Sequence, residues 1–333
     1  MYMVAGHLAG LLSGTTWEQA LRQRLFEPLG MTRSNFSVAV SQADDDFALP
    51  HRSDDGKLKV IPFRNLDLVG PAGSVNSSIN EMTKWLSFNL EGRSGLVSKA
   101  TLDELQSPHM TLPADGVAGS IQQAAYGLGW IVGIYKGHRI VTHGGGIDGF
   151  TTSVMLFPDD NLGLVAFDNA ALGIGNLLNL MAAERILGLD STDLIAQAAE
   201  QRAQAAAAQK KAQDSKDSTR VARTRPSHDL TDYAGSYAHP GYGTLTIGTA
   251  GKSLHARFND LEAELEHWHY DQWRGAPLGT PGEAPLPFLF RTDLEGSIGS
   301  VEVPFEPAAS PIRFLKTPDP SMSDPDVIAR YAG

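Results

Sequence analysis

Apolar and polar residues alternate along the middle of the chain in a pattern that is typical of β-strands. Residues 126–132 and 139–141 are two such runs, and Gly137 between them predicts the turn of a β-hairpin. Residues 150–157 and 162–167 predict two further strands joined by a polar turn. Because residues 162–167 are almost entirely apolar, the pattern predicts a central strand.

A helix is predicted directly after these strands. Apolar residues recur there at helical intervals, and a glycine stands where a helix end favours one. The residues are Leu177, Leu178, Met181, Ala182, Ile186, Leu187 and Gly188.

Residues 1–14 are apolar enough to suggest a signal peptide, but they lack lysine and arginine and are too short to span a bilayer. A buried helix is expected instead, with Leu8, Leu11 and Leu12 forming its apolar stripe. A new helix is then predicted from Thr15, because a glutamate three residues later gives the spacing of a capping box.

Ser78 and Glu81 have the same capping-box spacing and predict a further helix, which carries Trp85 and Leu86 on its apolar side. Ser78 is therefore interpreted as a helix cap rather than as a catalytic serine.

The composition changes at residues 191–225, which are rich in alanine, glutamine, lysine and glutamate and carry few large apolar side chains. Such a segment favours a helix by propensity but offers little for packing. We therefore predict a semi-rigid helical linker between a first domain, residues 1–190, and a last domain, residues 226–333.

The last domain is predicted to be all-β. Short apolar runs are separated there by glycine and proline, which is typical of a small antiparallel barrel or sandwich. The predicted strands are residues 233–237, 244–247, 254–258, 261–270, 288–290, 298–305 and 312–315.

Two histidines in this domain, His267 and His269, fall on one strand face, and paired histidines are possible ligands of a transition metal. They share the parity of apolar residues such as Leu265, and no third ligand lies nearby in the sequence. We therefore expect an inward-facing, hydrogen-bonded pair and no metal. The alternating glutamates of the same strand, Glu262, Glu264 and Glu266, are expected on a solvated face.

Charge and cysteine content narrow the possible partners. The net charge of -11 and the pI near 5.3 argue against a nucleic acid or an anionic membrane as a partner. The absence of cysteine excludes disulfides, thiolate metal sites and a cysteine nucleophile. No cofactor is expected, and the location stays open, with the cytoplasm favoured.

Candidate chemistry lies at His143, which four glycines follow closely at positions 144, 145, 146 and 149. Glycine has no Cβ to block a ligand, so backbone N–H groups can point at a substrate oxygen there, while His143 supplies a titratable side chain. A glycine-rich hairpin turn with one exposed histidine is the simpler alternative.

Further segments carry a resemblance to a known family. Residues 26–32 are similar to its F-x-P-L-G-M segment, residues 71–78 to its A-G-G-x-x-S-T loop, and residues 126–130 to its Y-G-x-G-W strand. In this order the chain resembles the serine hydrolase family of class C β-lactamases, penicillin-binding D,D-peptidases and related esterases and D-aminopeptidases. Residues 232–237 and 265–270 resemble a lipocalin-like C-terminal domain found in some members.

The resemblance implies an α+β fold, in which an antiparallel sheet packs with helices in a partial β-lactamase/transpeptidase-like arrangement. In that family an S-x-x-K helix start, a Y-x-N loop and a K-T-G or H-x-G strand meet at the active site. Residues 143–145 match the third element. This implies catalytic roles for His143 and for the backbone N–H of Gly146, as an oxyanion-hole donor, with Gly144 and Gly145 binding substrate.

The other two elements are missing. No S-x-x-K occurs in the sequence, and Tyr2-Met3-Val4 lacks the asparagine of Y-x-N. The resemblance implies that the Y-x-N motif lies just before Met1. Acyl transfer by this route requires a hydroxyl nucleophile with a neighbouring base. We expect amide or ester hydrolysis through a serine acyl-enzyme in a longer parent protein, and an inactive, truncated relative in this chain.

The alternative from another class is a non-catalytic module that binds a ligand or a protein on the same fold. Under either interpretation the expected partner is a small-molecule or peptide substrate, and the oligomeric state stays open.

Overall fold

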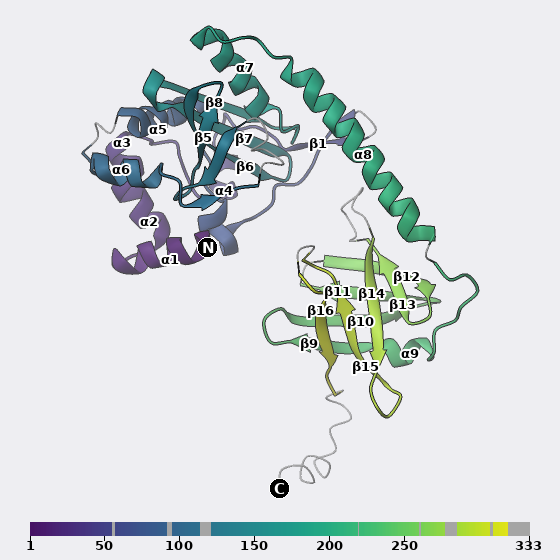
Figure 1. The fold of residues 1–333 in the computed structure, drawn as a ribbon. Helices are drawn as coiled ribbons and strands as arrows, with labels where there is room; N and C mark the ends of the chain where they lie inside the picture. Colours follow the sequence, from purple (N-terminus) through teal and green to yellow (C-terminus); the bar gives the residue numbers. More distant parts are fainter. Residues whose placement is uncertain are drawn as a thin grey trace. The chain divides into compact units, whose positions relative to one another are not determined.

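The computed structural model describes residues 1–54, 57–91, 95–113, 121–218, 220–259, 261–276, 285–306 and 309–318. The chain divides into two compact units, Met1–Arg202 and Ala203–Gly333. Figure 1 shows a sheet with helices in the first unit and a β-barrel in the second.

The first unit is built on a six-stranded antiparallel sheet with the strand order β3-β4-β5-β6-β7-β8. Each strand pairs with its neighbour in sequence, and β5 and β6 are joined by a tight turn at Lys136 and Gly137, both with positive φ. The predicted hairpin forms, but its first arm is residues 131–135 and not 126–132, because residue 126 ends β4 and residues 127–130 lie between strands; the two strands after it are confirmed. The strands are β3 Met110–Thr111, β4 Gln122–Tyr126, β5 Ile131–Tyr135, β6 His138–Ile147, β7 Phe150–Phe157 and β8 Leu162–Asp168.

The strand that was expected to be central, β8, lies at one end of this sheet and pairs only with β7 among the described residues. Its apolar sequence has another cause, because helices α5 (Ile79–Glu91) and α7 (Gly175–Leu187) both pack on it. A Cβ added to Gly163 of β8 would lie 3.2 Å from the Leu86 side chain of α5. The strand is therefore apolar because helices cover its faces, and not because neighbouring strands pair with both of its edges.

Alternate residues of the strands fill two cores. Met155 of β7 packs in the core that contains Leu180 of α7, whereas its neighbour Leu156 packs in the core that contains Leu86 of α5. Helix α7 ends at Gly188, which has the left-handed backbone that the sequence predicted.

Helix α1 (Tyr2–Leu12) forms where it was expected, but its leucines are not the buried face. Leu8, Leu11 and Leu12 are 50%, 63% and 79% exposed. The buried side is made by glycine instead, because a Cβ on Gly6 would lie 2.4 Å from Pro71 and one on Gly10 would lie 2.8 Å from the backbone nitrogen of Trp17. The predicted leucine stripe is wrong, and close backbone approach holds this helix.

The next helix, α2 (Trp17–Leu21), begins one residue later than predicted. Its N-cap is Thr16, whose side chain accepts a hydrogen bond from the backbone N–H of Gln19 at 3.3 Å. Thr16 and Gln19 have the same spacing as Thr15 and Glu18, so the sequence offered two registers for one cap.

The cap predicted at Ser78 is confirmed. The backbone N–H of Glu81 donates to Ser78 Oγ at 3.4 Å, and α5 follows. The Glu81 side chain is buried and accepts hydrogen bonds from the backbone N–H of Arg33 at 3.1 Å and from Lys84 Nζ at 2.7 Å. This carboxylate therefore joins the start of α5 to the chain around Arg33.

Shorter elements complete the first unit. Gly30 ends α3 with a left-handed backbone, and Phe26, Met31 and Phe36 form a small core in this part of the chain. The elements are a π-helical turn Arg22–Phe26, α3 Glu27–Leu29, α4 Val38–Gln42, α6 Lys99–Leu105, the 3-10 turns Asp67–Ala72 and Pro158–Asp160, and a separate hairpin of β1 His51–Asp54 with β2 Lys57–Val60.

The segment that was expected to be helical, rich in alanine and glutamine, forms α8 (Leu194–Ser218). Leu194 is buried in the core beneath α7, and Arg202 Nη2 donates to the Leu172 carbonyl at 2.8 Å. The first turns of α8 therefore pack with the first unit.

The second unit is a closed eight-stranded antiparallel barrel (Figure 1). The predicted small β-barrel is confirmed, although residue 233 belongs to the short helix α9 (Leu230–Tyr233) and one strand, β13, was not predicted. The strands are β9 Gly235–His239, β10 Gly243–Ala250, β11 Ser253–Phe258, β12 Leu261–His269, β13 Gln272–Gly275, β14 Leu286–Thr292, β15 Ile298–Val303 and β16 Ile312–Lys316.

Large apolar side chains fill the inside of the barrel. Tyr237, Trp273 and Phe314 are almost fully buried there, together with Leu245 and Leu265. Glu262, Glu264 and Glu266 alternate onto the exposed side of β12, as the sequence predicted.

Candidate active site

The glycine-rich segment after His143 is part of a strand. Residues 144–146 lie within β6 and pair with residues 151–153 of β7. The chain turns only after the Ile147–Phe150 pair, at Gly149, whose φ is +81°. The simpler alternative, a hairpin turn around His143, is therefore wrong.

Strand β6 extends beyond its other neighbour, β5. Ile131 is the first residue of β5 and pairs with Thr142, so residues 143–147 have no strand partner on that side among the described residues. Alternate residues of an antiparallel strand direct their N–H and C=O groups to opposite sides. Residues 144–146 are also exposed, and we call their unpaired side the glycine edge.

His143 is held by hydrogen bonds on both ring nitrogens. Nδ1 lies 2.6 Å from the Gly144 carbonyl oxygen, and Nε2 lies 2.9 Å from the Tyr126 hydroxyl. A carbonyl can only accept, so Nδ1 donates to Gly144, and in a neutral imidazole Nε2 accepts from Tyr126. The ring is therefore held in one orientation beside the glycine edge.

Tyr2 of α1 completes this group, although the sequence gave it no role. Its hydroxyl contacts the Tyr126 hydroxyl and lies 3.3 Å from His143 Nε2. Since the Tyr126 proton is directed to His143, Tyr2 is the donor to Tyr126. The three residues are far apart in sequence, and no local pattern marks Tyr2 as their neighbour.

Burial, followed by the contact with Tyr2, raises the pKa of Tyr126 to about 12. A phenol with this pKa keeps its proton at neutral pH. Tyr126 therefore acts as a hydrogen-bond donor that orients His143, and it does not act as a base.

A cleft of about 680 Å³ opens on the sheet face that carries His143. His143 pairs directly with Val154, which lines the cleft, and directly opposed residues of paired strands point to the same face. His143 and residues 144–146 are not themselves among the lining residues. They lie beside the cleft, whose other side is formed by the chain between Arg33 and Ser78.

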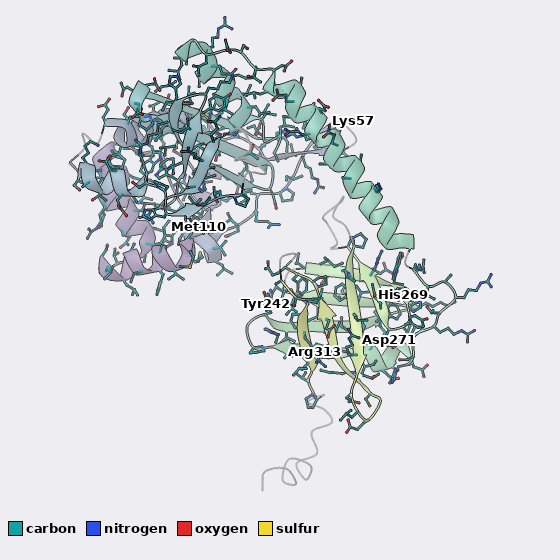
Figure 2. All side chains as sticks on the ribbon, in the orientation of Figure 1. Lys57, Met110, Tyr242, His269, Asp271 and Arg313 are labelled. Carbon is teal, nitrogen blue, oxygen red and sulfur yellow. The ribbon has the colours of Figure 1, made fainter. Side chains whose placement is uncertain are left out.

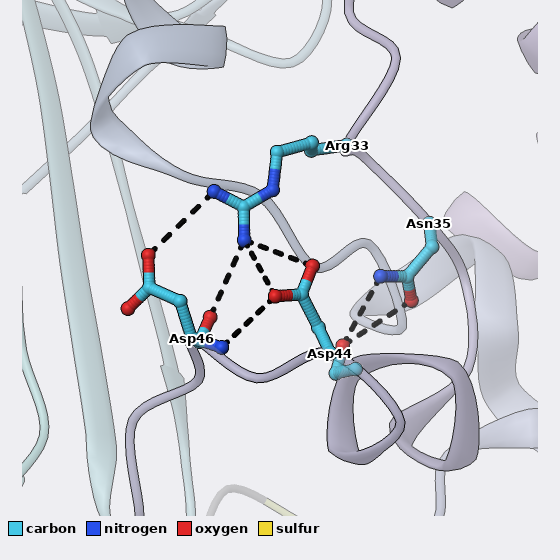
Figure 3. A network of polar contacts seen from close by, with 5 residues as sticks. Arg33, Asn35, Asp44 and Asp46 are labelled. Atoms are coloured by element: carbon cyan, nitrogen blue, oxygen red, sulfur yellow. Dashed lines mark hydrogen bonds and ion pairs between the residues drawn. The ribbon is translucent and has the colours of Figure 1, made fainter.

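An arginine clamp fixes the rim of this cleft (Figure 3). Arg33 Nη2 lies 2.8 Å from each carboxylate oxygen of Asp44, and its Nη1 lies 3.6 Å from Asp46. The hydrogen bond from Arg33 holds the pKa of Asp44 below its ordinary value. Across the cleft, Arg64 Nε pairs with Asp148 at 2.7 Å, which ties the loop around residue 64 to the turn after β6.

Three serines of the loop over residues 71–78 line the cleft. Ser78 caps α5, and Ser77 Oγ lies 2.9 Å from Ser34 Oγ. Ser74 is 7% exposed, and its Oγ has no hydrogen-bond partner in the described structure. None of the three has a hydrogen bond or ion pair to a lysine or histidine that could take its proton.

His267 and His269 are each hydrogen-bonded to a backbone group. Figure 2 labels His269 on the barrel, where its Nδ1 accepts from the backbone N–H of Val221 at 3.1 Å. His267 Nε2 donates to the Tyr270 carbonyl at 2.8 Å, and the strand register shifts between the two histidines. In the part of the chain that the structure describes, no group of three or more metal-binding side chains comes together.

The comparisons with known proteins agree with this fold. A family model described as Beta-lactamase matches residues 1–176, which is more than half of the chain, and the chain belongs to this family. A second model, for a domain of unknown function called DUF3471, matches residues 219–316, which hold the barrel.

Among curated relatives, the unguisins hydrolase ungD of Aspergillus violaceofuscus (strain CBS 115571) is 28% identical over 303 residues, covering 77% of this chain and 50% of that protein. The unguisins hydrolase ungD' of Aspergillus campestris (strain IBT 28561) is 28% identical over 172 residues, covering 51% of this chain and 32% of that protein. This chain therefore spans half or less of the length of these two relatives.

Among solved structures, the octameric penicillin-binding protein homologue from Pyrococcus abyssi matches with a TM-score of 0.50 and 19% identity. The match covers 92% of this chain and 61% of that one. At this identity the likeness concerns the fold. No helix among the described residues is long and apolar enough to cross a membrane.

Proposed function

We propose that this chain carries the substrate-binding side of an amide or ester hydrolase that works through a serine acyl-enzyme. The observation that supports this most is the His143 group beside the glycine edge. The edge offers backbone N–H groups, of which Gly146 is the oxyanion donor, and Gly144 and Gly145 have no side chain that would cover a substrate carbonyl there. His143 stands next to them as an imidazole oriented by hydrogen bonds on both ring nitrogens.

The described chain supplies no activated nucleophile. S-x-x-K and Y-x-N do not occur in the sequence, and no serine of the cleft contacts a base. An oxyanion hole and a binding cleft alone give only residual rate enhancement. We therefore infer that this polypeptide, by itself, binds substrate without forming an acyl-enzyme.

Two curated relatives are named as unguisins hydrolases, which supports hydrolysis of a small molecule as the chemistry of this fold in a longer protein. The same cleft also suits the second candidate function, a ligand-binding module without turnover. What favours that candidate is the arginine clamp, because a preformed rim serves binding with or without a nucleophile.

Covalent labelling tests the proposal. The protein is incubated with a fluorophosphonate and, separately, with a labelled penicillin, and its intact mass is measured. A known serine β-lactamase serves as the reagent control. We expect unchanged mass for this chain, whereas a stoichiometric adduct on one serine would overturn the inference that it lacks a nucleophile.

A further inference from the structure

The cleft beside β6 has an aromatic side. The Phe63 ring lies 6.1 Å from that of Phe47 and 6.0 Å from that of Phe150, measured between ring centroids, and all three residues line the cleft together with Phe167. Phe47 is 40% exposed and Phe167 is 38% exposed. Soluble proteins rarely leave several large aromatic rings of one concave surface in water without a ligand or partner for them.

The charges that line the cleft are unbalanced. Five aspartates stand against two arginines among the described lining residues, which gives a net charge of −3 at neutral pH. Both arginines are already paired, Arg33 with Asp44 and Asp46 and Arg64 with Asp148. The arginines therefore hold the rim together, and an anionic ligand would have to compete with these aspartates for them.

Two acids of the lining, Asp67 and Asp168, form no ion pair with another residue that the structure describes. Asp168 receives hydrogen bonds from the Thr151 hydroxyl and from the backbone N–H groups of Ala170 and Leu172. Burial raises the pKa of Asp168, but these hydrogen bonds outweigh it and keep the pKa below its ordinary value. The other acid, Asp67, is exposed and is hydrogen-bonded to Asn65 at 3.0 Å.

A ligand with a positive charge on an apolar body satisfies both features. Its ammonium group would gain from the negative charges of Asp67 and Asp168 and from the negative faces of the phenylalanine rings.

We propose that the cleft binds amides or peptides that carry a free amino group next to aromatic or other bulky apolar side chains. This inference rests on the proposed function only in taking the cleft as the place where substrate binds. It adds a preference for amines, which the glycine edge and His143 do not determine.

Three forms of one dipeptide test the charge preference on the unaltered protein. The forms are Phe-Phe-amide with a free amino terminus, its N-acetyl derivative and its N-succinyl derivative, which carry charges of +1, 0 and −1. Isothermal titration calorimetry at low salt gives each affinity. We expect the free amine to bind at least about fivefold more tightly than the acetyl form, and the succinyl form to bind most weakly. Equal or tighter binding of the acetyl form would overturn the proposal.

Variants locate the effect. Asp67→Asn combined with Asp168→Asn should bring the amine-to-acetyl affinity ratio close to one, because the amide keeps the acceptor oxygen but removes the charge. Asp159→Asn, an exposed acid outside the cleft lining, should leave the ratio unchanged. Phe63→Ala should weaken all three peptides alike. A ratio that survives the double substitution would contradict the assignment to these carboxylates.

The outcome is separate from that of covalent labelling. Binding is measured without turnover. An adduct with a fluorophosphonate would overturn the inference that the chain lacks a nucleophile, but the amine preference would still be judged from the measured affinities alone. Conversely, loss of the preference with no adduct would remove this inference only.

Discussion

The imidazole of His143 is positioned by hydrogen bonds more than by packing. Its ring is half-buried, Nδ1 donates to the Gly144 carbonyl, and Nε2 accepts from Tyr126. Hydrogen bonds of this kind contribute about 0.5–1.5 kcal/mol each, and less where water can replace them. A residue held in this way is suited to meet a ligand without being essential to the fold.

His143→Ala should therefore lower the free energy of unfolding by at most about 1 kcal/mol, because water can satisfy the Tyr126 hydroxyl and the Gly144 carbonyl that it leaves behind. The same substitution should weaken binding of Phe-Phe-amide. Urea denaturation and calorimetry give the two quantities. Tyr126→Phe is the matched control, since it removes the orienting hydroxyl and keeps the ring. A stability loss above about 2 kcal/mol would assign His143 a structural role.

The residues of this group show what one sequence can and cannot predict. His143 and the glycines were identified because they adjoin one another, and Tyr126 was included in a strand motif. Their meeting at 2.9 Å depends on the register in which β5 pairs with β4 and β6. Tyr2 depends on the docking of α1 as well, which the sequence pattern assigned to the wrong face.

At the scale of elements, the turn between β6 and β7 sets the position of the glycine edge. Gly149 has a φ of +81°, and a Cβ there would lie 2.4 Å from Pro50 and 2.8 Å from the backbone nitrogen of His51. Gly137, in the turn between β5 and β6, has a φ of +88° but nothing within 4 Å of an added Cβ. Substitutions at these two glycines therefore distinguish the cost of a left-handed backbone from the cost of steric contact.

Gly137→Ala should cost about 1 kcal/mol of unfolding free energy, from the left-handed backbone alone. Gly149→Ala should cost at least about 2 kcal/mol more, because Pro50 and the backbone of His51 must move as well. Thermal and urea denaturation of the two variants measure the difference. Equal losses would show that the contact between this turn and β1 does not form.

A buried carboxylate joins the other end of β5 to α7. Glu184 Oε1 accepts from the Tyr135 hydroxyl at 2.7 Å and from Lys136 Nζ at 2.6 Å, and Oε2 accepts from the backbone N–H of Thr192 at 2.9 Å. Burial opposes ionisation of Glu184, but these hydrogen bonds prevail and lower its pKa to about 2.

Because this pKa is lowered on folding, Glu184 should contribute stability that is complete above pH 4.5 and is lost as the pH falls toward 2. The contribution is on the order of 3 kcal/mol. We expect Glu184→Gln to lower stability at pH 7 and to flatten its dependence on pH between 5 and 3. Asp103 forms an exposed ion pair with Lys99, so Asp103→Asn is the control. It should leave the slope of stability against pH unchanged. A slope unchanged in Glu184→Gln would contradict this account.

Element types were easier to predict than their partners. The β5–β6 hairpin, β7, α7 and the barrel followed from local periodicity and turn residues, because side-chain alternation reports which faces are covered. The place of β8 at the end of the sheet did not follow, because apolar runs say nothing about which edges are paired. The N-cap of α2 moved by one residue, because two threonines offered equivalent caps.

At the scale of the whole molecule, α1 exposes a band of leucines. Leu8, Leu11 and Leu12 are at least half exposed, while the glycine side of the helix is close-packed. An exposed apolar band of this kind binds hydrophobic dyes and promotes association in solution. The sequence had assigned these leucines to the core, so their substitution separates the two interpretations.

Replacing all three leucines by glutamine should change the free energy of unfolding by less than about 1 kcal/mol, since little buried area is lost. It should also reduce binding of an environment-sensitive dye and reduce concentration-dependent association, measured by sedimentation velocity. Phe26→Ala is the contrasting control, expected to cost about 3 kcal/mol because its side chain is in a core. A loss of similar size in the leucine variant would show that these leucines are buried, as the sequence predicted.

The central claim is that the glycine edge of β6 receives the carbonyl oxygen of a ligand. Gly146→Val tests it cleanly, because a Cβ at Gly146 would lie no closer than 3.9 Å to Thr151, its φ is not left-handed, and valine is favoured in strands. Stability should therefore change by less than about 0.5 kcal/mol, while the side chain covers the edge.

The direct measurement is an NMR titration of backbone amides with Phe-Phe-amide, in the unaltered protein and in Gly146→Val. The account predicts the largest shifts at the amides of residues 144–146 and at the facing residues of β7, together with at least about a tenfold loss of affinity in the variant. Full affinity in Gly146→Val, or shifts confined to other parts of the first unit, would contradict the assignment of β6 as the substrate-binding edge.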